Sequence, residues 1–375
     1  MLEHPSNHSE PLRRTPLAER HERLGARLGA FAGWDMPIRY PEGILAEHQH
    51  TRSAASLFDI CHMGEFRVRG ATAAGELDRL CARRVVDQKP GTCRYNFLVT
   101  AAGTVRDDLL VYRLAADEFY LVVNAGTVDS DAAWLRQNLG TGTVFADESA
   151  VTAKLDLQGP RCFEVLADLG LPLEAVPPYF NWRRVQLRGL DVLLSRTGYT
   201  GERGVEIYVP ADAVGPLWDA LLAQPLVKPA GLGARDTLRL EMGYPLYGHE
   251  LNLSTTPVEA GFERLVRRTG GDEFVGAAAL AQPAARRLAG FVLEGRRAAR
   301  EGARVWDRTG QEIGVVTSGA FGPSLGCAVA LGYVQRNAAL VPGAQVRLGP
   351  DPDAALPATL AALPFYTKGT ARSDG

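Results

Sequence analysis

The sequence lacks three features that would each indicate a class of function: a long apolar run, a strong net charge and a secretory signal. None of its stretches holds the roughly 18 consecutive apolar residues that a membrane-spanning helix needs. The 375 residues carry a formal net charge of −2 without clusters of lysine and arginine, which argues against binding to nucleic acid or to an anionic membrane. Residues 1–14 have no apolar segment, so we expect a loose tail there and no secretory signal.

Cysteine is scarce and scattered. The five cysteines lie far apart, are odd in number and include no Cys-x-x-Cys pair, so we expect neither a zinc site nor a disulfide framework. Scattered reduced thiols are typical of cytoplasmic proteins. The composition therefore predicts a cytoplasmic protein.

Several common catalytic motifs are missing too. The sequence contains no phosphate loop of the G-x-x-x-x-G-K-[ST] type, no G-x-S-x-G nucleophile elbow and no H-E-x-x-H metal motif. The seven histidines form no cluster. The spacing of His48 and His50 would put their side chains on one face of a strand but would splay them on a helix. We therefore expect no bound metal, and chemistry that depends on a bound cofactor or substrate.

The sequence does contain a mixture of helical and strand patterns, over a length that allows two or three domains. A helix is predicted over residues 17–28, and an ordered loop over residues 31–37. Strand and helix patterns alternate through residues 65–140 and again through residues 151–261. After residue 274, short apolar strands separated by glycine and proline predict a small antiparallel barrel or sandwich. The predicted fold class is therefore α+β.

Four segments combine polar groups with apolar surroundings at an unusual density. They are FDICHM at 58–63, GTVRDDLLVY at 103–112, SRTGYTGE with GVE at 195–206, and GLGARDTLRLE with GYPLYGHE at 231–250. Shorter motifs accompany them in order at 32–37, 157–160, 256–259, 317–319 and 363–366. This ordered set resembles the glycine cleavage T-protein (aminomethyltransferase) family, and the resemblance covers residues 15–366.

The resemblance implies a three-domain cloverleaf of the α+β class, with antiparallel sheets, a small C-terminal β-barrel or sandwich domain and a folate site in the centre. Residues 1–52 and 150–270 would form a first, discontinuous, folate-binding domain. Residues 53–149 would form a second α+β domain that carries Asp108, and residues 271–375 would form the C-terminal β domain.

The resemblance also implies a reaction. Members of the family transfer the one-carbon unit from aminomethyl-lipoyl H-protein to tetrahydrofolate and release ammonia. Tetrahydrofolate would thus be the cosubstrate, and the lipoylated H-protein of the glycine cleavage system would be the partner that supplies the lipoyl group. We expect no metal, no nucleic acid and no membrane, and a monomer or weak oligomer.

The central candidate is Asp108, which matches the family's catalytic aspartate. Because strand side chains alternate, Asp108 shares one face with Leu110 and Tyr112, whereas Asp107 points to the other face. A fixed carboxylate can stabilise a positively charged one-carbon unit and can orient or deprotonate a folate amine. The alternative is that either aspartate only stabilises the turn before the strand.

Glu206 and Arg235 match the family's folate-contacting glutamate and substrate-binding arginine. An ionised carboxylate at Glu206 can accept both adjacent N–H donors of a pterin ring. The guanidinium of Arg235 can hold a carboxylate or carbonyl group. Alternatively, Glu206 faces solvent, and Arg235 forms an ion pair with Asp236 or Glu241.

Further candidates match the lining of the family's folate pocket or are placed to meet a ligand. They are Met63, Tyr95, Tyr112 and Asn124, Tyr199 between two glycines, and Arg372 in the tail. The methionine and tyrosine side chains could equally be core residues, because that is their usual place. The alternative for the tail beyond Phe365, favoured by its terminal position, is a frayed segment in which Arg372 would not meet the glutamate of a folate.

The sequence also departs from the family pattern. The departures are at Cys61, Thr104, Arg106, Arg264, Gly322 and Cys327. None of them removes an expected folate contact. Arg106 stands beside the two aspartates, so we expect its charge to lower the pKa of the carboxylates. Together these departures leave room for a different one-carbon donor.

Two other functions are compatible with the same fold. One is a tetrahydrofolate-dependent demethylase or methyltransferase of a small N-, O- or S-methyl compound, which would need no carrier protein. The other is a non-enzymatic folate-binding module, whose representatives carry a Lys-Gly-Cys-Tyr-x-Gly-Gln-Glu signature. This chain has Gly-Tyr-Pro-Leu-Tyr-Gly-His-Glu at 243–250 in the comparable region, which argues against the second alternative.

Overall fold

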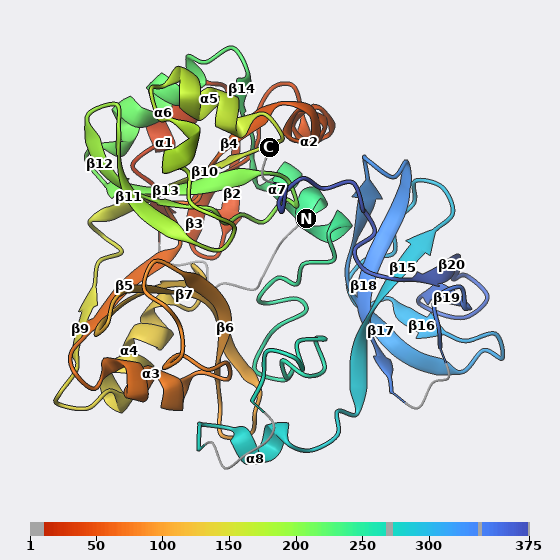
Figure 1. The fold of residues 1–375 in the computed structure, drawn as a ribbon. Helices are drawn as coiled ribbons and strands as arrows, with labels where there is room; N and C mark the ends of the chain where they lie inside the picture. The colour runs from red at the N-terminus through yellow and green to blue at the C-terminus, as the bar shows by residue number, and fades with distance from the viewer. Residues whose placement is uncertain (1–10, 268–272, 337–339, 374–375) are drawn as a thin grey trace.

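The chain folds into three bodies that meet at a common centre (Figure 1). The structure is a computed structural model that describes residues 11–267, 273–336 and 340–373. Two bodies are built on sheets covered by helices, and the third is a closed barrel. The predicted α+β class with a small C-terminal barrel is confirmed. Within the described ranges, no helix is both long enough and apolar enough to cross a lipid bilayer.

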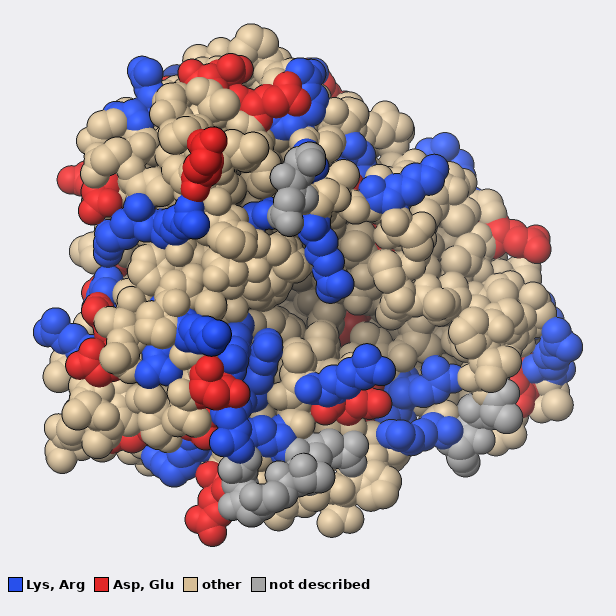
Figure 2. Space-filling model, in the orientation of Figure 1, with Lys and Arg blue, Asp and Glu red and all other residues tan. Residues whose placement is uncertain are grey.

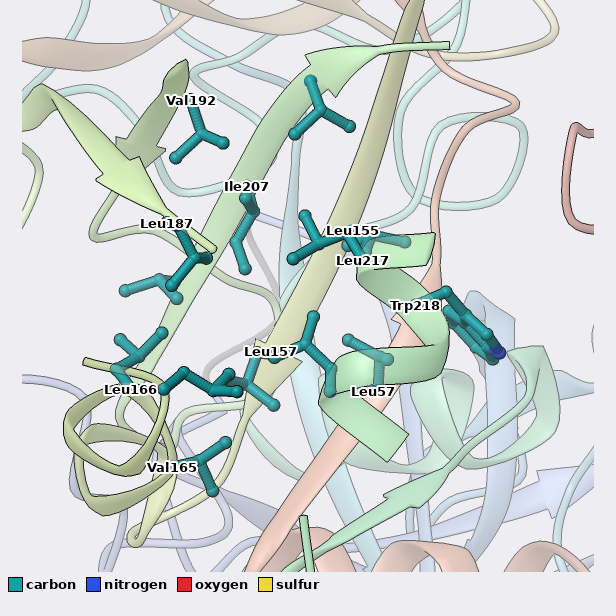
Figure 3. Close-up of a cluster of buried hydrophobic side chains, with 14 of the residues drawn as sticks. Leu57, Leu155, Leu157, Val165, Leu166, Leu187, Val192, Ile207, Leu217 and Trp218 are labelled. Carbon is teal, nitrogen blue, oxygen red and sulfur yellow. The ribbon is translucent and has the colours of Figure 1, made fainter. Parts of the chain in front are cut away.

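The first sheet has the strand order β11-β12-β13-β10-β4-β14, and only its β4–β14 pair is parallel. Its strands and covering helices are β4 (Ala55–Asp59), β10 (Thr152–Gln158), α5 (Cys162–Asp168), β11 (Trp182–Leu187), β12 (Leu190–Ser195), β13 (Gly204–Pro210), α6 (Val214–Leu222) and β14 (Val227–Pro229). Alternating apolar side chains of β10 and β13, such as Leu155, Leu157 and Ile207, meet Leu217 and Trp218 of α6 (Figure 3). Because this face forms the core, the opposite face of β10 and β13 is left to carry polar side chains.

The second sheet is antiparallel throughout, with the order β6-β7-β8-β5-β9. Its strands and helices are β5 (Gly64–Arg69), α3 (Ala73–Leu80), β6 (Cys93–Val99), β7 (Val105–Ala115), β8 (Glu118–Val123), α4 (Val128–Asn138) and β9 (Val144–Asp147). Leu109 and Val111 of β7 pack with Leu77 of α3 and Leu135 of α4. The strand alternation therefore turns Asp108 to the uncovered face.

The third body is a barrel closed in the order β15-β18-β17-β16-β19-β20. Its strands are β15 (Arg286–Leu293), β16 (Arg304–Trp306), β17 (Glu312–Gly322), β18 (Cys327–Gln335), β19 (Gln345–Gly349) and β20 (Leu356–Ala361). Val329 and Leu331 of β18 pack against Leu240 of helix α7 (Leu232–Glu241). Helix α7 thus joins the barrel to the first body.

Further elements complete the fold. They are β1 (Arg13–Arg14), α1 (Ala18–Arg23), β2 (Arg27–Phe31), β3 (Trp34–Arg39), α2 (Ile44–Ser53), η1 (Leu173–Ala175) and α8 (Ala277–Leu280). The helix predicted over 17–28 is wrong in its second half, because Gly25 takes a left-handed φ of 70° and the chain continues as β2. The loop predicted over 31–37 is also wrong. Ala32 and Gly33 both have positive φ, 50° and 82°, and so turn β2 back onto β3 as a hairpin.

The resemblance implied that the second domain begins at residue 53. In the structure, the chain leaves the first sheet later than this position. Strand β4 pairs with β10 through Leu57 and Leu157, so residues 55–59 lie in the first sheet. In addition, Leu251 and Val258, expected in the first domain, pack with Phe97 of β6 in the second body.

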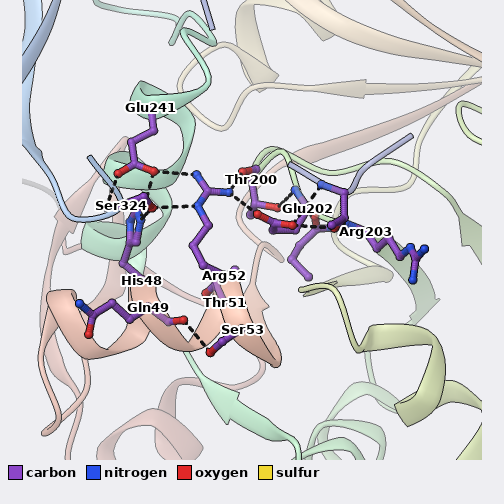
Figure 4. A network of polar contacts seen from close by, with 12 residues as sticks. His48, Gln49, Thr51, Arg52, Ser53, Thr200, Glu202, Arg203, Glu241 and Ser324 are labelled. Atoms are coloured by element: carbon purple, nitrogen blue, oxygen red, sulfur yellow. Dashed lines mark hydrogen bonds and ion pairs between the residues drawn. The ribbon is translucent and has the colours of Figure 1, made fainter. Parts of the chain in front are cut away.

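A buried polar network ties the first body to the barrel (Figure 4). Arg52 of α2 donates to Glu202 and to Glu241, each at 2.9 Å, and to Ser324 between β17 and β18 at 3.2 Å. Its guanidinium also lies 4.1 Å from the centre of the Tyr366 ring. Only 8% of the Arg52 side chain is exposed, so one shielded cation is shared by parts of the chain that are far apart in sequence.

The C-terminal segment is held against the first body. Thr370 donates to Glu202 through its backbone N at 3.2 Å and its hydroxyl at 2.6 Å. Arg196 donates to the carbonyl oxygen of Ser373 at 2.8 Å. The alternative of a frayed tail is therefore wrong for the described part of this segment, and its anchoring could not be predicted from a short polar sequence.

Removing the shared cation should destabilise the protein. We expect Arg52→Ala to lower the free energy of unfolding in urea by about 3–5 kcal/mol, because it leaves the buried carboxylates of Glu202 and Glu241 without their common partner. The exposed pair of Arg304 and Glu312 provides the control, since Arg304→Ala should cost less than about 1 kcal/mol. Equal stability of the two variants would contradict this account of the network.

Candidate active site

A cavity of about 570 Å³ lies where the bodies meet, and its walls come from both sheets, from the segment after α7 and from the C-terminal segment. Figure 2 shows the hollow at the middle of one face, with basic side chains near its rim. Every predicted site residue except Tyr112 lines this cavity: Met63, Tyr95, Asp108, Asn124, Tyr199, Glu206, Arg235 and Arg372. Positions 63 and 372, which are 309 residues apart in the sequence, are thus brought to one place.

Asp108 projects into the cavity from β7 with both carboxylate oxygens engaged. The Tyr95 hydroxyl donates to Oδ2 at 2.9 Å, and the Asn124 side-chain amide donates to Oδ1 at 2.9 Å. Burial and the neighbouring charge of Asp107 raise the pKa of Asp108 to about 7, although these two hydrogen bonds oppose the rise. Asp108 can therefore exchange a proton near neutral pH, as a general base requires.

Asp107 lies on the opposite face of β7 and supports Asn124. It accepts hydrogen bonds from the Asn124 backbone N at 3.0 Å and from the Asn124 amide at 2.9 Å. Burial and the proximity of Asp131 on α4 raise the pKa of Asp107 well above its ordinary value. The two adjacent aspartates thus differ in role, since Asp108 faces the cavity and Asp107 holds the amide that orients it.

Arg106 does not act on Asp108 as expected. The register of β6 and β7 shifts so that Leu98 pairs with Asp107 and Val99 with Val105, which leaves Arg106 as an extra residue in β7. Its guanidinium lies 5.2 Å from the centre of the Trp134 ring on α4, away from the cavity. The expected lowering of the pKa of Asp108 is therefore wrong, because the irregularity turns the cation to the other face of the sheet.

Glu206 projects into the same cavity from β13 of the first sheet. Its Oε2 accepts hydrogen bonds from the hydroxyls of Thr197 at 2.8 Å, Tyr208 at 3.2 Å and Tyr112 at 3.4 Å. These hydroxyls hold the carboxylate from behind, so Oε1 remains for a ligand. Tyr112 is fully buried and lies behind Glu206, not in the cavity wall. The solvent-facing alternative for Glu206 is wrong, because 4% of the residue is exposed.

Arg235 stands in the first turn of α7 and forms part of a stacked wall. Its Nη1 donates to Asp156 at 2.6 Å, and its guanidinium lies 4.9 Å from the centre of the Tyr199 ring. Tyr199 in turn stacks on Tyr244, with 5.7 Å between ring centres. The expected alternative of an ion pair with Asp236 is wrong, because Asp236 accepts from Arg239.

Glu241, the other alternative partner of Arg235, is bound to Arg52 and His48. His48 also meets Thr237 at 2.8 Å through its other ring nitrogen. In the part of the chain that the structure describes, no three metal-ligating side chains of His, Cys, Asp or Glu gather closely enough to hold an ion.

The cavity also contains residues that the sequence did not single out. His62 is 5% exposed, and burial lowers its pKa to about 3, so it presents a neutral ring. Cys93, Arg83 and Phe262 line the cavity as well. His62 belongs to the polar segment at 58–63 described above. Cys93, Arg83 and Phe262 come from stretches whose local sequence pattern does not indicate a site.

Family models and known proteins match this chain over most of its length. The profile of the GCVT N-terminal domain matches residues 17–269, and that of the glycine cleavage T-protein C-terminal barrel domain matches residues 286–367. An aminomethyltransferase of Saccharopolyspora erythraea is 42% identical, covering 95% of this chain and 98% of its own length. One of Deinococcus deserti is also 42% identical, covering 95% and 97%.

A solved structure gives the same result in three dimensions. The glycine cleavage system aminomethyltransferase T from Bartonella henselae superposes with a TM-score of 0.89 at 37% sequence identity, covering 96% of this chain and 99% of that one. The profiles, the relatives and the shared fold all extend over nearly the whole chain. The chain therefore belongs to the glycine cleavage T-protein family of aminomethyltransferases.

Proposed function

We propose that the central cavity binds tetrahydrofolate, and that this chain, an aminomethyltransferase of the glycine cleavage system, transfers the one-carbon unit there with release of ammonia. The observation that carries the proposal is the convergence of Asp108 and Glu206, from two different sheets, on one cavity. The family uses tetrahydrofolate, and the 42% identical relatives are aminomethyltransferases, which supports the same reaction in this chain.

The cavity suits a folate in its size and its lining. Its volume of about 570 Å³ falls within the range of roughly 300–1,000 Å³ that is usual for small-molecule sites. Tyr95, Tyr199 and Tyr244 offer aromatic surfaces to a ring system. The carboxylate of Glu206 can accept two adjacent N–H donors of a pterin, and Arg372 offers a cation to the glutamate end of the ligand.

Asp108 has surroundings that fit its proposed catalytic role. When bound, tetrahydrofolate supplies the amines that accept the one-carbon unit. The ionised form of Asp108 stabilises positive charge near the reacting carbon and holds or accepts the proton of an amine. Tyr95 and Asn124 fix both of its oxygens, so the carboxylate is oriented before a ligand arrives. Its pKa of about 7 makes both protonation states available at neutral pH.

The donor in this proposal is the aminomethyl-lipoyl arm of H-protein, which has to reach Asp108 through the open side of the cavity. The proposal includes a cytoplasmic location, since the cysteines of the described ranges are free thiols. It also includes a monomer or weak oligomer. It keeps three domains, with two changes to the boundaries given above: the first boundary follows Asp59, and the segment with Leu251 and Val258 belongs to the second domain.

A coupled assay for ammonia and methylene-tetrahydrofolate tests the reaction. We expect both products only when aminomethyl-lipoyl H-protein and tetrahydrofolate are supplied together, because this chain provides neither the carbon nor its acceptor. Turnover of a small methyl compound in the absence of H-protein would instead support the demethylase alternative and would contradict the proposal.

Asparagine at position 108 keeps the shape of the side chain and removes its charge. We expect Asp108→Asn to lower kcat by about 10²–10⁴-fold. In the unsubstituted enzyme kcat should rise with pH through about 7, because the pKa of Asp108 is raised to that value and the ionised form is active. The residual activity of the variant should lack this rise.

The exposed Asp117, in the turn between β7 and β8, provides the control for this experiment. Asp117→Asn should keep both the wild-type kcat and the wild-type pH profile. An Asp108→Asn enzyme with full activity, or with an unchanged pH profile, would exclude Asp108 as the proton acceptor.

Glutamine at position 206 should weaken the binding of folate. We expect Glu206→Gln to raise the dissociation constant for tetrahydrofolate about tenfold or more, because an amide cannot accept two adjacent N–H donors. Titration calorimetry measures this constant directly. Glu65→Gln is the matched control, since Glu65 is also buried but does not line the cavity. Equal affinity of the two variants would rule out this mode of folate binding.

A further inference from the structure

One carboxylate behind the cavity has not been given a function. Asp156 lies in β10 between Leu155 and Leu157, both of which point into the apolar core. The strand alternation turns Asp156 to the opposite face, toward the cavity side, yet the residue is fully buried. An ionisable side chain in such a place is costly unless a partner offsets the loss of solvation.

That partner is Arg235. Asp156 Oδ2 accepts from Arg235 Nη1 at 2.6 Å, and Oδ1 is buried without a hydrogen-bond partner among the described residues. The Asp156 side chain is 0% exposed and the Arg235 side chain is 15% exposed, so the guanidinium alone reaches the cavity. The contact therefore holds Arg235 from behind while its remaining donors face the cavity.

A second feature of Asp156 is its position opposite Glu206. The two residues are paired directly across β10 and β13, so their side chains leave the same face of the sheet as neighbours. Arg235 is thus placed near two carboxylates, and the structure pairs it with Asp156. Glu206 is held instead by the hydroxyls of Thr197 and Tyr208.

We propose that Asp156 is a positioning residue for ligand binding, because it fixes the guanidinium of Arg235 against Tyr199 and keeps it from closing on Glu206. Without Asp156, the flexible cation would lose its anchor and would be drawn to the nearest remaining carboxylate. Both Arg235 and Glu206 would then be less available to a ligand. This inference rests on the proposed binding of tetrahydrofolate in the cavity.

The test is the dissociation constant for tetrahydrofolate, measured by titration calorimetry on the full chain. We expect Asp156→Ala to raise it about tenfold, as for the loss of a hydrogen bond to a charged group, and the isosteric Asp156→Asn to raise it less. We expect kcat at saturating tetrahydrofolate to change less than about threefold, because the contact acts on binding and not on the proton transfer.

A double variant separates positioning from general damage to the fold. If Asp156 acts through Arg235, then Asp156→Ala added to Arg235→Ala should weaken binding no further than Arg235→Ala alone. Asp78→Asn is the structural control, since Asp78 and Arg267 form a similarly short and shielded pair of 2.6 Å outside the cavity. It should lower the melting temperature without changing the dissociation constant.

Two results would overturn the inference. Additive losses in the double variant would show that Asp156 does not act through Arg235, and unchanged affinity in both Asp156→Asn and Asp156→Ala would show that it does not act on binding at all. The failure of the proposed function would look different, because the unsubstituted chain itself would then not bind tetrahydrofolate, and the inference would fall with it. Asp156→Asn keeps the experiment decisive if Asp156→Ala does not fold.

Discussion

The site depends on keeping two carboxylates buried, oriented and chemically distinct beside one cavity. A buried carboxylate is unfavourable without partners, and the two partner sets differ. Asp108 is held by one phenol and one amide, while burial beside Asp107 raises its pKa to about 7, so it can exchange a proton. Glu206 is held by hydroxyls from behind, so its carboxylate is fixed in place as an acceptor. The proposed division of work between proton transfer and ligand binding follows from this difference.

The same constraint explains why the cavity needs more than one body. Asp108 belongs to one sheet and Glu206 to another, while the wall with Arg235 and Tyr199 is bounded by the segment after α7. The network around Arg52 fixes these parts relative to the barrel and the C-terminal segment. The geometry of the cavity therefore depends on the stability of the interfaces between the bodies.

Much of this could be predicted from the sequence, because local patterns report local structure. Strand alternation separated Asp108 from Asp107, and ordered motifs identified the family and eight of the residues that line the cavity. The β2–β3 hairpin was missed because Ala-Gly is a weaker turn signal than Asn-Gly. The direction of the Arg106 side chain depends on a register shift between strands. The partner of Asp156 comes from a helix that is distant in sequence. Both features depend on tertiary structure, so no local sequence pattern could have shown them.

The most direct test of the account is a crystal structure of the chain with tetrahydrofolate bound. The account predicts that the pterin edge donates to Glu206, that an acceptor amine lies within hydrogen-bonding distance of Asp108, and that Arg235 stays paired with Asp156. A folate bound elsewhere, or bound in the cavity with Glu206 and Asp108 both out of contact, would contradict it.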